Sequence, residues 1–161
     1  AVRASTKKPV ETVNWPAGRG PKGNDGVAAD VKQNAGSRGY VELIYALQNK
    51  MTYGAVRNAS GKFVLATTDG VTAAAAATAT TMPADYRVSI TNAPGATSYP
   101  ISSFTWLLIP LHSADPNKAK ALSEFLYWML DHGEAQAAAL SYAPLPKPVQ
   151  VMVRKSIAQV K

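Results

Sequence analysis

The sequence predicts an α/β fold, and three observations lead to this prediction. A short β-prone stretch at residues 12–15 is followed by a glycine-rich loop and a helical pattern over residues 24–33. The apolar run at residues 103–109 lacks alternation, which is typical of a strand that is covered on both faces of a sheet. Beyond this run the pattern is almost entirely helical.

The composition limits the class of protein. The chain has 161 residues, of which 47% are hydrophobic and 17% charged, the balance of one globular domain or of two small lobes. Without cysteine it forms no disulfide, thiolate metal site or thiol nucleophile. No apolar run approaches the ~20 residues that span a bilayer. The first 12 residues lack the apolar core of a signal peptide, so an export signal would lie on a preceding segment.

The net charge favours a negatively charged partner. It is +7, from 17 basic and 10 acidic residues, and it attracts an anionic ligand or an acidic protein surface at long range. The basic residues are scattered along the chain, whereas nucleic-acid-binding surfaces carry a basic stripe with interleaved aromatic side chains. We therefore expect no nucleic acid partner.

Short strands and helices are expected to alternate in the first half of the chain. Asn24 or Asp25 is the expected N-cap of the first helix, because either side chain accepts hydrogen bonds from first-turn amides. Residues 39–42 are expected to form a strand that leads directly into a helix at residues 43–49.

A hairpin is expected next. Residues 53–57 form its first strand, the turn-prone residues 58–61 its loop, and residues 62–65 its return. The alanine-rich residues 71–80 favour a packing helix. Residues 86–91 alternate apolar and polar side chains, which predicts a half-buried strand.

Residues 92–100, rich in Gly, Pro, Ala and Ser, separate two composition regimes and mark the expected domain boundary. Asp115 and Pro116 predict the start of a helix, because Asp caps first-turn amides and Pro needs no donor there. Gly133 is expected to supply its left-handed end. One face carries the expected core stripe of Leu122, Phe125, Leu126 and Met129. The chain is completed by a helix at residues 134–140, a rigid turn at residues 142–146 and an amphipathic helix with Val149, Met152, Val153, Ser156 and Val160.

The histidines do not predict a metal site. His112 and His132 lie before and at the end of a long helix, and no His-x-x-x-His or cysteine pair accompanies them. No Gly-x-Ser-x-Gly sequence supports a serine hydrolase. We therefore expect no catalytic residue, no metal and no cofactor.

The glycine-rich loop at residues 18–23 matches Gly-x-Gly-x-x-Gly and lies between a predicted strand and a helix. In a dinucleotide-binding fold the helix begins within this motif, whereas Pro21 and Lys22 delay it here. The pattern therefore favours a connector that makes tight backbone turns. A nucleotide-dependent enzyme is the lowest-ranked alternative.

A second interpretation of this region concerns the start of the following helix. Gly23, Asn24, Asp25 and Gly26 open a helix whose free amides and positive dipole end can face an anion. Asp25 is compatible with an anion if it accepts a proton from the ligand or caps the helix. These four residues are the candidate ligand-binding residues of the chain.

Five short motifs follow one another along the chain: Val13-Asn14-Trp15-Pro16, Gly23-Asn24-Asp25-Gly26-Val27-Ala28, Gly39-Tyr40-Val41-Glu42 with Tyr45-Ala46, Tyr99-Pro100-Ile101-Ser102-Ser103, and Tyr142-Ala143-Pro144-Leu145-Pro146. In order and spacing, these motifs resemble the periplasmic phosphate-binding proteins of Pst-type phosphate ABC transporters. The resemblance covers residues 12–161.

The resemblance implies a type II periplasmic-binding-protein fold, in which two α/β lobes are joined by two crossing strands and phosphate binds in the cleft between them. Residues 1–98 would form part of the second lobe, residues 99–103 the hinge, and residues 104–161 the strand and helices that complete the first lobe. Such a receptor performs no chemistry. It captures inorganic phosphate in the periplasm or at the cell surface, closes, and delivers it to the membrane permease subunits.

The chain departs from the family in its phosphate ligands. The family's main contacts come from a Thr-containing loop, a Ser and an Asp, and an Arg-x-x-x-Ser-Gly-Thr loop, none of which occurs here. Ser60 and Gly61 are followed by Lys62 rather than Thr, and no arginine stands four residues before the serine. The resemblance therefore implies the C-terminal half of a receptor, with the N-terminal half as its partner. The alternative is an autonomous basic domain that docks an acidic partner.

Overall fold

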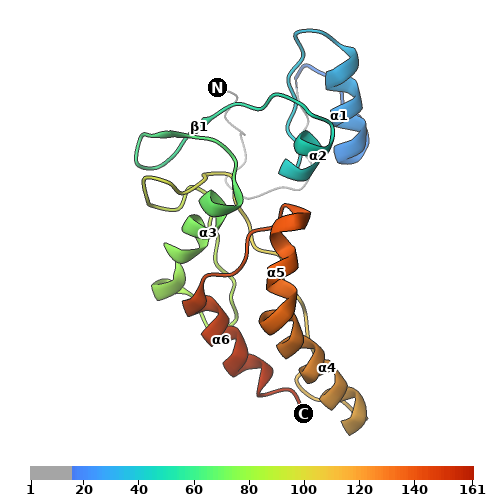
Figure 1. Cartoon of the computed structure of the whole chain (residues 1–161), viewed down its shortest axis with the longest axis vertical. Helices are drawn as coiled ribbons and strands as arrows, with labels where there is room; N and C mark the ends of the chain where they lie inside the picture. Colours follow the sequence, from blue (N-terminus) through green and yellow to red (C-terminus); the bar gives the residue numbers. More distant parts are fainter. Residues whose placement is uncertain (1–15) are drawn as a thin grey trace.

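The computed structural model describes residues 16–161, so the predicted strand at residues 12–15 lies outside the described residues. Helices dominate, and the sheet is one small antiparallel pair (Figure 1). The elements follow in the order α1 (Gly23–Gln33), α2 (Leu43–Gln48), β1 (Val56–Arg57), β2 (Phe63–Val64), α3 (Thr68–Ala76), η1 (Ala79–Thr81), α4 (Pro116–Trp128), η2 (Met129–Gly133), α5 (Glu134–Ala137), η3 (Ala138–Leu140) and α6 (Lys147–Ile157).

Helix α1 has the predicted extent but not the predicted cap. Its N-cap residue is Lys22, whose side chain caps no amide. Asn24 instead bonds with Glu42, 18 residues further on, so the side chain expected to cap the helix joins two segments. The prediction of Asn24 or Asp25 as the N-cap is therefore wrong.

The segment before α2 packs closely on α1. A Cβ added at Gly39 would lie 2.8 Å from Val27 Cγ1 and 2.9 Å from Val31 Cγ2, so only glycine fits here without movement. The strand predicted at residues 39–42 is absent, because this segment meets a helix rather than a neighbouring strand. Helix α2 itself is confirmed.

The predicted hairpin is confirmed, with strands of two residues each. Val56 pairs with Val64, and Arg57 with Phe63. Asn58, in the turn, is only 5% exposed. Its side-chain amide donates to three carbonyls of a distant loop, those of Gly95, Ala96 and Ser98, over 3.0–3.2 Å. The hairpin is thereby tied to residues 92–100.

Helix α3 confirms the predicted alanine-rich helix and begins three residues earlier than expected. The Thr67 hydroxyl accepts a hydrogen bond from the Gly70 amide at 3.0 Å and caps the first turn. Gly70 is buried, and its carbonyl accepts the Tyr99 amide at 3.0 Å. Small side chains such as Ala74, which is fully buried, allow this close approach.

Residues 86–91 show the predicted alternation of buried and exposed side chains, but they do not form a strand. Tyr86 and Val88 are half-buried, Ile90 is buried, and the residues between them are exposed. However, Tyr86 has φ 60°, and its carbonyl accepts the Val88 amide at 2.8 Å in a tight turn. This turn interrupts the extended backbone that a strand needs.

The prediction for residues 103–109 is wrong in its burial. Leu107 is 57% exposed and Leu108 is 93% exposed, whereas a strand covered on both faces would bury both. The prediction that both faces of this strand are covered rested only on the apolar composition of the segment. Within the described residues, no sheet lies on either side of this segment.

The C-terminal helices begin as predicted. The carboxylate of Asp115 accepts hydrogen bonds from the amides of Asn117 and Lys118, and Pro116 is the first helical residue. Leu126 of the predicted stripe is buried, but Phe125 is 54% exposed. The expected core face is therefore only partly covered.

The expected break at Gly133 does not occur. Gly133 is helical, with φ −64° and ψ −36°. The backbone passes from α4 through the π-helical turn η2 into α5 and η3, as the continuous ribbon in Figure 1 shows. The left-handed residue is Ser141, with φ 60°, eight positions later.

Helix α6 packs along α4. Arg154 pairs with Asp131 and lies 5.8 Å from the ring centre of Tyr127, whose hydroxyl donates to the Arg154 carbonyl at 3.4 Å. Val149 and Ile157 of α6 are buried. In the part of the chain that the structure describes, no helix combines the length and apolarity needed to cross a bilayer.

Candidate functional site

The four predicted ligand-binding residues lie together at the start of α1. Gly23 has φ +69°, a backbone conformation that favours glycine, and turns the chain into the helix. The first-turn amides of an α-helix have no intrahelical acceptor, and the N-cap side chain supplies none here. Gly23, Asn24, Asp25 and Gly26 therefore present backbone donors at the positive end of an 11-residue helix.

The Asn24 side chain is already engaged. Its amide nitrogen donates to Glu42 Oε1 at 3.3 Å, and its oxygen accepts the Glu42 amide at 3.0 Å. The pair holds the segment before α2 against the first turn of α1. The Asn24 side chain thus has a structural role, and only its backbone remains for a ligand.

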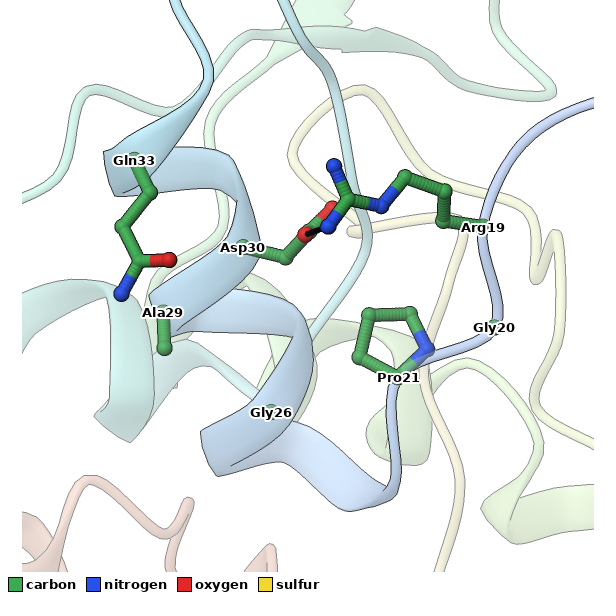
Figure 2. Close-up of a pocket in the computed structure, with 7 residues that line it drawn as sticks. All are labelled: Arg19, Gly20, Pro21, Gly26, Ala29, Asp30 and Gln33. Carbon is green, nitrogen blue, oxygen red and sulfur yellow. Dashed lines mark ion pairs between the residues drawn. The ribbon is translucent and has the colours of Figure 1, made fainter.

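An open cavity of about 380 Å³ lies along one side of α1, and of the four predicted residues only Gly26 lines it (Figure 2). Pro21 lies against the helix, since a Cβ added at Gly26 would be 3.2 Å from Pro21 Cβ. One wall comes from the glycine-rich loop and the other from one side of α1. The lining residues are Arg19, Gly20, Pro21, Gly26, Ala29, Asp30 and Gln33.

Arg19 is the cationic side chain of this cavity, and sequence reasoning did not single it out. Its Nη2 lies 2.8 Å from Asp30 Oδ1, and its Nη1 donates to Asn34 Oδ1 at 3.3 Å. The Arg19 side chain is 68% exposed, whereas that of Asp30 is 18% exposed. An incoming anion would compete with Asp30 for the guanidinium. The only sequence signal was the position of Arg19 between two glycines.

Two segments on either side of the loop at residues 92–100 lie against each other, next to the expected hinge at residues 99–103. The Asn92 amide donates to the Pro100 carbonyl at 2.7 Å, and the Thr91 hydroxyl to the Ser102 carbonyl at 3.4 Å. The two segments therefore run antiparallel. Burial raises the pKa of Tyr99, so its hydroxyl stays protonated at neutral pH.

The remaining candidate groups do not assemble into a site. Within residues 16–161, no group of three or more His, Asp or Glu side chains is placed to hold a metal ion. His132 lies beside the Trp128 ring, with ring centres 6.4 Å apart, whereas His112 lines a small cavity with Lys118 and Leu122.

Comparison with known protein families matches residues 5–132 to the PBP superfamily domain. Proteins named phosphate-binding protein PstS also align with the chain. The one from Xylella fastidiosa strain Temecula1 is 44% identical over 135 residues, which cover 84% of this chain and 37% of the relative. The one from Pasteurella multocida is 37% identical over 151 residues, which cover 94% of this chain and 43% of the relative.

A relative from another organism gives a similar result. The phosphate-binding protein PstS of Methanocaldococcus jannaschii is 36% identical over 167 residues, which cover 94% of this chain and 43% of the relative. The chain thus spans about two fifths of the length of the curated relatives that it matches.

Proposed function

The chain belongs to the PBP superfamily, and we propose that it acts as part of the phosphate-binding subunit of an ABC-type phosphate importer. The observation that supports this function is the alignment of 84–94% of the chain with proteins named for phosphate binding. This relationship favours a transport receptor over a nucleotide-dependent enzyme and over an autonomous basic domain.

The chain is proposed to contribute to two lobes of a type II receptor. Residues 1–98 belong to the second lobe, residues 99–103 form the hinge, and residues 104–161 complete the first lobe. The change of composition at residues 92–100 supports a boundary in this place, and the antiparallel contact between residues 91–92 and residues 100–102 closes the loop at that boundary.

The proposed contacts of this chain with phosphate are the backbone amides of residues 23–26. Their support is the uncapped start of α1, whose residue Gly26 also lines the cavity that contains Arg19. Asp25 is not the N-cap, so if it faces the anion it would do so by accepting a proton from the ligand. Hydrogen phosphate carries such a proton, which suits this arrangement.

The proposed partners are inorganic phosphate, the permease subunits of the importer, and the N-terminal half of the receptor, which supplies the main phosphate ligands. The proposed location is the periplasm or the cell surface, where receptors of this type capture their ligand.

Calorimetry with phosphate tests this function. The chain alone is expected to bind phosphate weakly or not at all, because the ligand motifs of the family are absent from its sequence. Adding the complementary part of the Xylella fastidiosa relative is expected to restore binding, with sulfate as the control anion. Micromolar binding by the chain alone, or no binding by the pair, would contradict the proposal.

The role of Asp25 is tested in the same complemented receptor. Asp25→Asn is expected to weaken phosphate binding about tenfold, because the amide cannot accept the ligand proton as a carboxylate does. Asp69→Asn is the matched control, since Asp69 is the acidic residue in the first turn of α3. Equal effects of the two variants would point to overall charge rather than to a contact at α1.

A further inference from the structure

The β-hairpin carries apolar side chains on both of its faces. Its register pairs Val56 with Val64, both half-buried, and Arg57 with Phe63. Phe63 is 73% exposed, and Leu65, two positions further along the alternation, is 50% exposed. A hairpin with one buried face normally carries polar side chains on the other, so this arrangement marks a surface with a partner. We call Arg57, Phe63 and Leu65 the outer hairpin face.

The turn beside this face is held in place by the Asn58 side chain. Its Oδ1 accepts the amides of Ser60 at 3.1 Å and of Lys62 at 3.0 Å. Its amide nitrogen ties the turn to the loop at residues 95–98, and Figure 1 shows the two loops side by side at one edge of the molecule. The exposed residues 94–97 of that loop carry no charge. A partner therefore meets a preorganised surface and does not have to order a loose loop.

Two cations stand beside the exposed apolar side chains. The Arg57 guanidinium folds back over the turn, because a Cβ added at Gly61 would lie 3.5 Å from Arg57 Nη2. Lys62 follows that glycine and is exposed. Among residues 16–161, neither cation pairs with a carboxylate. Residues 52–68 contain no Asp or Glu, so the hairpin is apolar and cationic at once.

Charge and size together select the partner of this face. A second copy would bring like charges together with no acidic residue to compensate them, which disfavours pairing of two hairpins. A specific protein interface buries about 800 Å² on each partner, whereas the hairpin has strands of only two residues each. An anionic lipid surface suits a small face, since its interface takes up aromatic and aliphatic side chains while its headgroups attract Lys and Arg.

We infer that the outer hairpin face binds an anionic phospholipid surface. Phe63 and Leu65 enter the interface between headgroups and acyl chains, and Arg57 and Lys62 lie at the level of the headgroups. Two apolar side chains and two cations make a weak and reversible contact, which leaves the protein free to come and go. The inference goes beyond the proposed function and does not depend on phosphate binding.

The test sediments the full chain with phospholipid vesicles and measures the bound fraction. Vesicles of an equal mixture of phosphatidylcholine and phosphatidylglycerol supply the anionic surface, and vesicles of phosphatidylcholine alone supply the neutral one. Binding to the anionic vesicles is expected to be at least about tenfold tighter than binding to the neutral vesicles, and to weaken as salt is added.

Substitution of Phe63 tests the apolar anchor. Phe63→Ser is expected to weaken binding to the anionic vesicles at least about tenfold. Phe125→Ser is the matched control, since Phe125 is 54% exposed and lies on α4. It is expected to change binding less than about twofold. Circular dichroism checks that both variants keep their helices, so that lost binding reflects the surface and not unfolding.

Substitution of Lys62 tests the electrostatic contribution. Lys62→Gln is expected to weaken binding about fivefold, because one cation near an anionic surface is lost. Lys118→Gln removes the same charge from an exposed residue of α4 and is expected to change binding less than about twofold. A difference between the two variants separates a contact at the hairpin from the effect of net charge.

The lack of cysteine in the sequence allows a second measurement. Leu65→Cys, labelled with a polarity-sensitive fluorophore, is expected to show a blue shift of emission when anionic vesicles are added. Gln136→Cys on α5, labelled in the same way, is expected to show none. This shift reports insertion of the hairpin and not attraction by net charge.

Several outcomes would overturn the inference. These are equal binding of Phe63→Ser and wild type, equal binding to anionic and neutral vesicles, and no shift at labelled Leu65→Cys. Loss of vesicle binding when the complementary part of the Xylella fastidiosa relative is added would assign the face to the rest of the receptor. Binding only to vesicles that contain the permease would assign it to a protein, and both results overturn the inference. Failure of vesicle binding would leave the proposed function standing, whereas vesicle binding by a receptor without phosphate affinity would reject that function alone.

Discussion

Residues 16–51 and residues 52–161 are held together in different ways. In the first region, the described hydrogen bonds and ion pairs between elements stay within the region, such as Asn24 with Glu42 and Arg19 with Asp30. In the second, side chains bridge long stretches of sequence. Asn58 reaches the loop at residues 95–98, 37 to 40 residues away, and Thr72 donates to the Pro144 carbonyl 72 residues away.

This difference predicts that the two regions respond differently to local changes. The α1–α2 region, residues 16–51, can shift as a unit without breaking a described polar bond to the frame, residues 52–161. The frame is cross-linked, so a displacement of one of its elements disturbs others. Four changes to the chain test this contrast, from the largest expected effect to the smallest.

Removal of the Asn58 side chain is expected to weaken the frame most. Asn58→Ala removes three carbonyl contacts, of which the one to Ser98 is buried, and this costs about 2–4 kcal/mol of unfolding free energy. Urea unfolding measures this loss. Hydrogen exchange in α1 is expected to stay unchanged, and faster exchange there would show that the two regions are coupled.

A methyl group at Gly39 is expected to act on the α1–α2 region alone. The added Cβ would meet Val27 and Val31 at less than 3.0 Å, and such overpacking costs about 1–3 kcal/mol. Gly20→Ala is the matched control, because no heavy atom lies within 4 Å of a Cβ there. Limited proteolysis of residues 16–51 reports the change. Destabilisation of α4 by Gly39→Ala would contradict the division into two regions.

The Arg19–Asp30 ion pair is expected to contribute little to stability. Arg19 is largely exposed, so Arg19→Ala should change the unfolding free energy by about 0–1 kcal/mol. Its effect is expected on phosphate affinity in the complemented receptor, because the cavity loses its cation. Arg38→Ala, on another exposed residue of the same region, serves as the control for net charge.

The smallest effect is expected from Glu134, within the frame. Burial raises the pKa of Glu134, although the Leu145 amide, which donates to its carboxylate at 2.8 Å, opposes the shift. The folded chain then binds this proton more tightly than the unfolded chain. The resulting stability is present below the ordinary value of 4.5 and is lost as the pH rises through the folded pKa. Glu134→Gln should therefore flatten the pH dependence of urea unfolding in this range.

Sequence reasoning predicted the elements that depend on local chemistry. The helix start at Asp115 and Pro116 was predictable because the cap and its amides lie within three residues. The hairpin was predictable from its turn. The expected strands at residues 39–42, 86–91 and 103–109 were not found, because a strand requires a distant partner that its own residues do not specify.

The same limit applies to the candidate site. The helix start at Gly23–Gly26 could be predicted from glycine and the helix dipole. The bond between Asn24 and Glu42 and the position of Arg19 beside Asp30 depend on tertiary contacts. The prediction that Gly133 ends the helix was wrong for a related reason. A glycine at a helix end and a glycine within a packed helix cannot be told apart from one sequence.

The π-helical turn at η2 determines the rotational position of the helical residues that follow it in α5 and η3. A π turn contains one residue more than an α turn, and one residue corresponds to a rotation of about 100° around the helix axis. Deletion of Leu130 would leave an unbroken helix of ordinary pitch. It would also swing Glu134 away from the Leu145 amide and turn the last helical residues to a different side. Insertions and deletions at this turn are thus expected to rotate the following helical residues around the helix axis, whereas substitutions there are expected to change only side-chain packing.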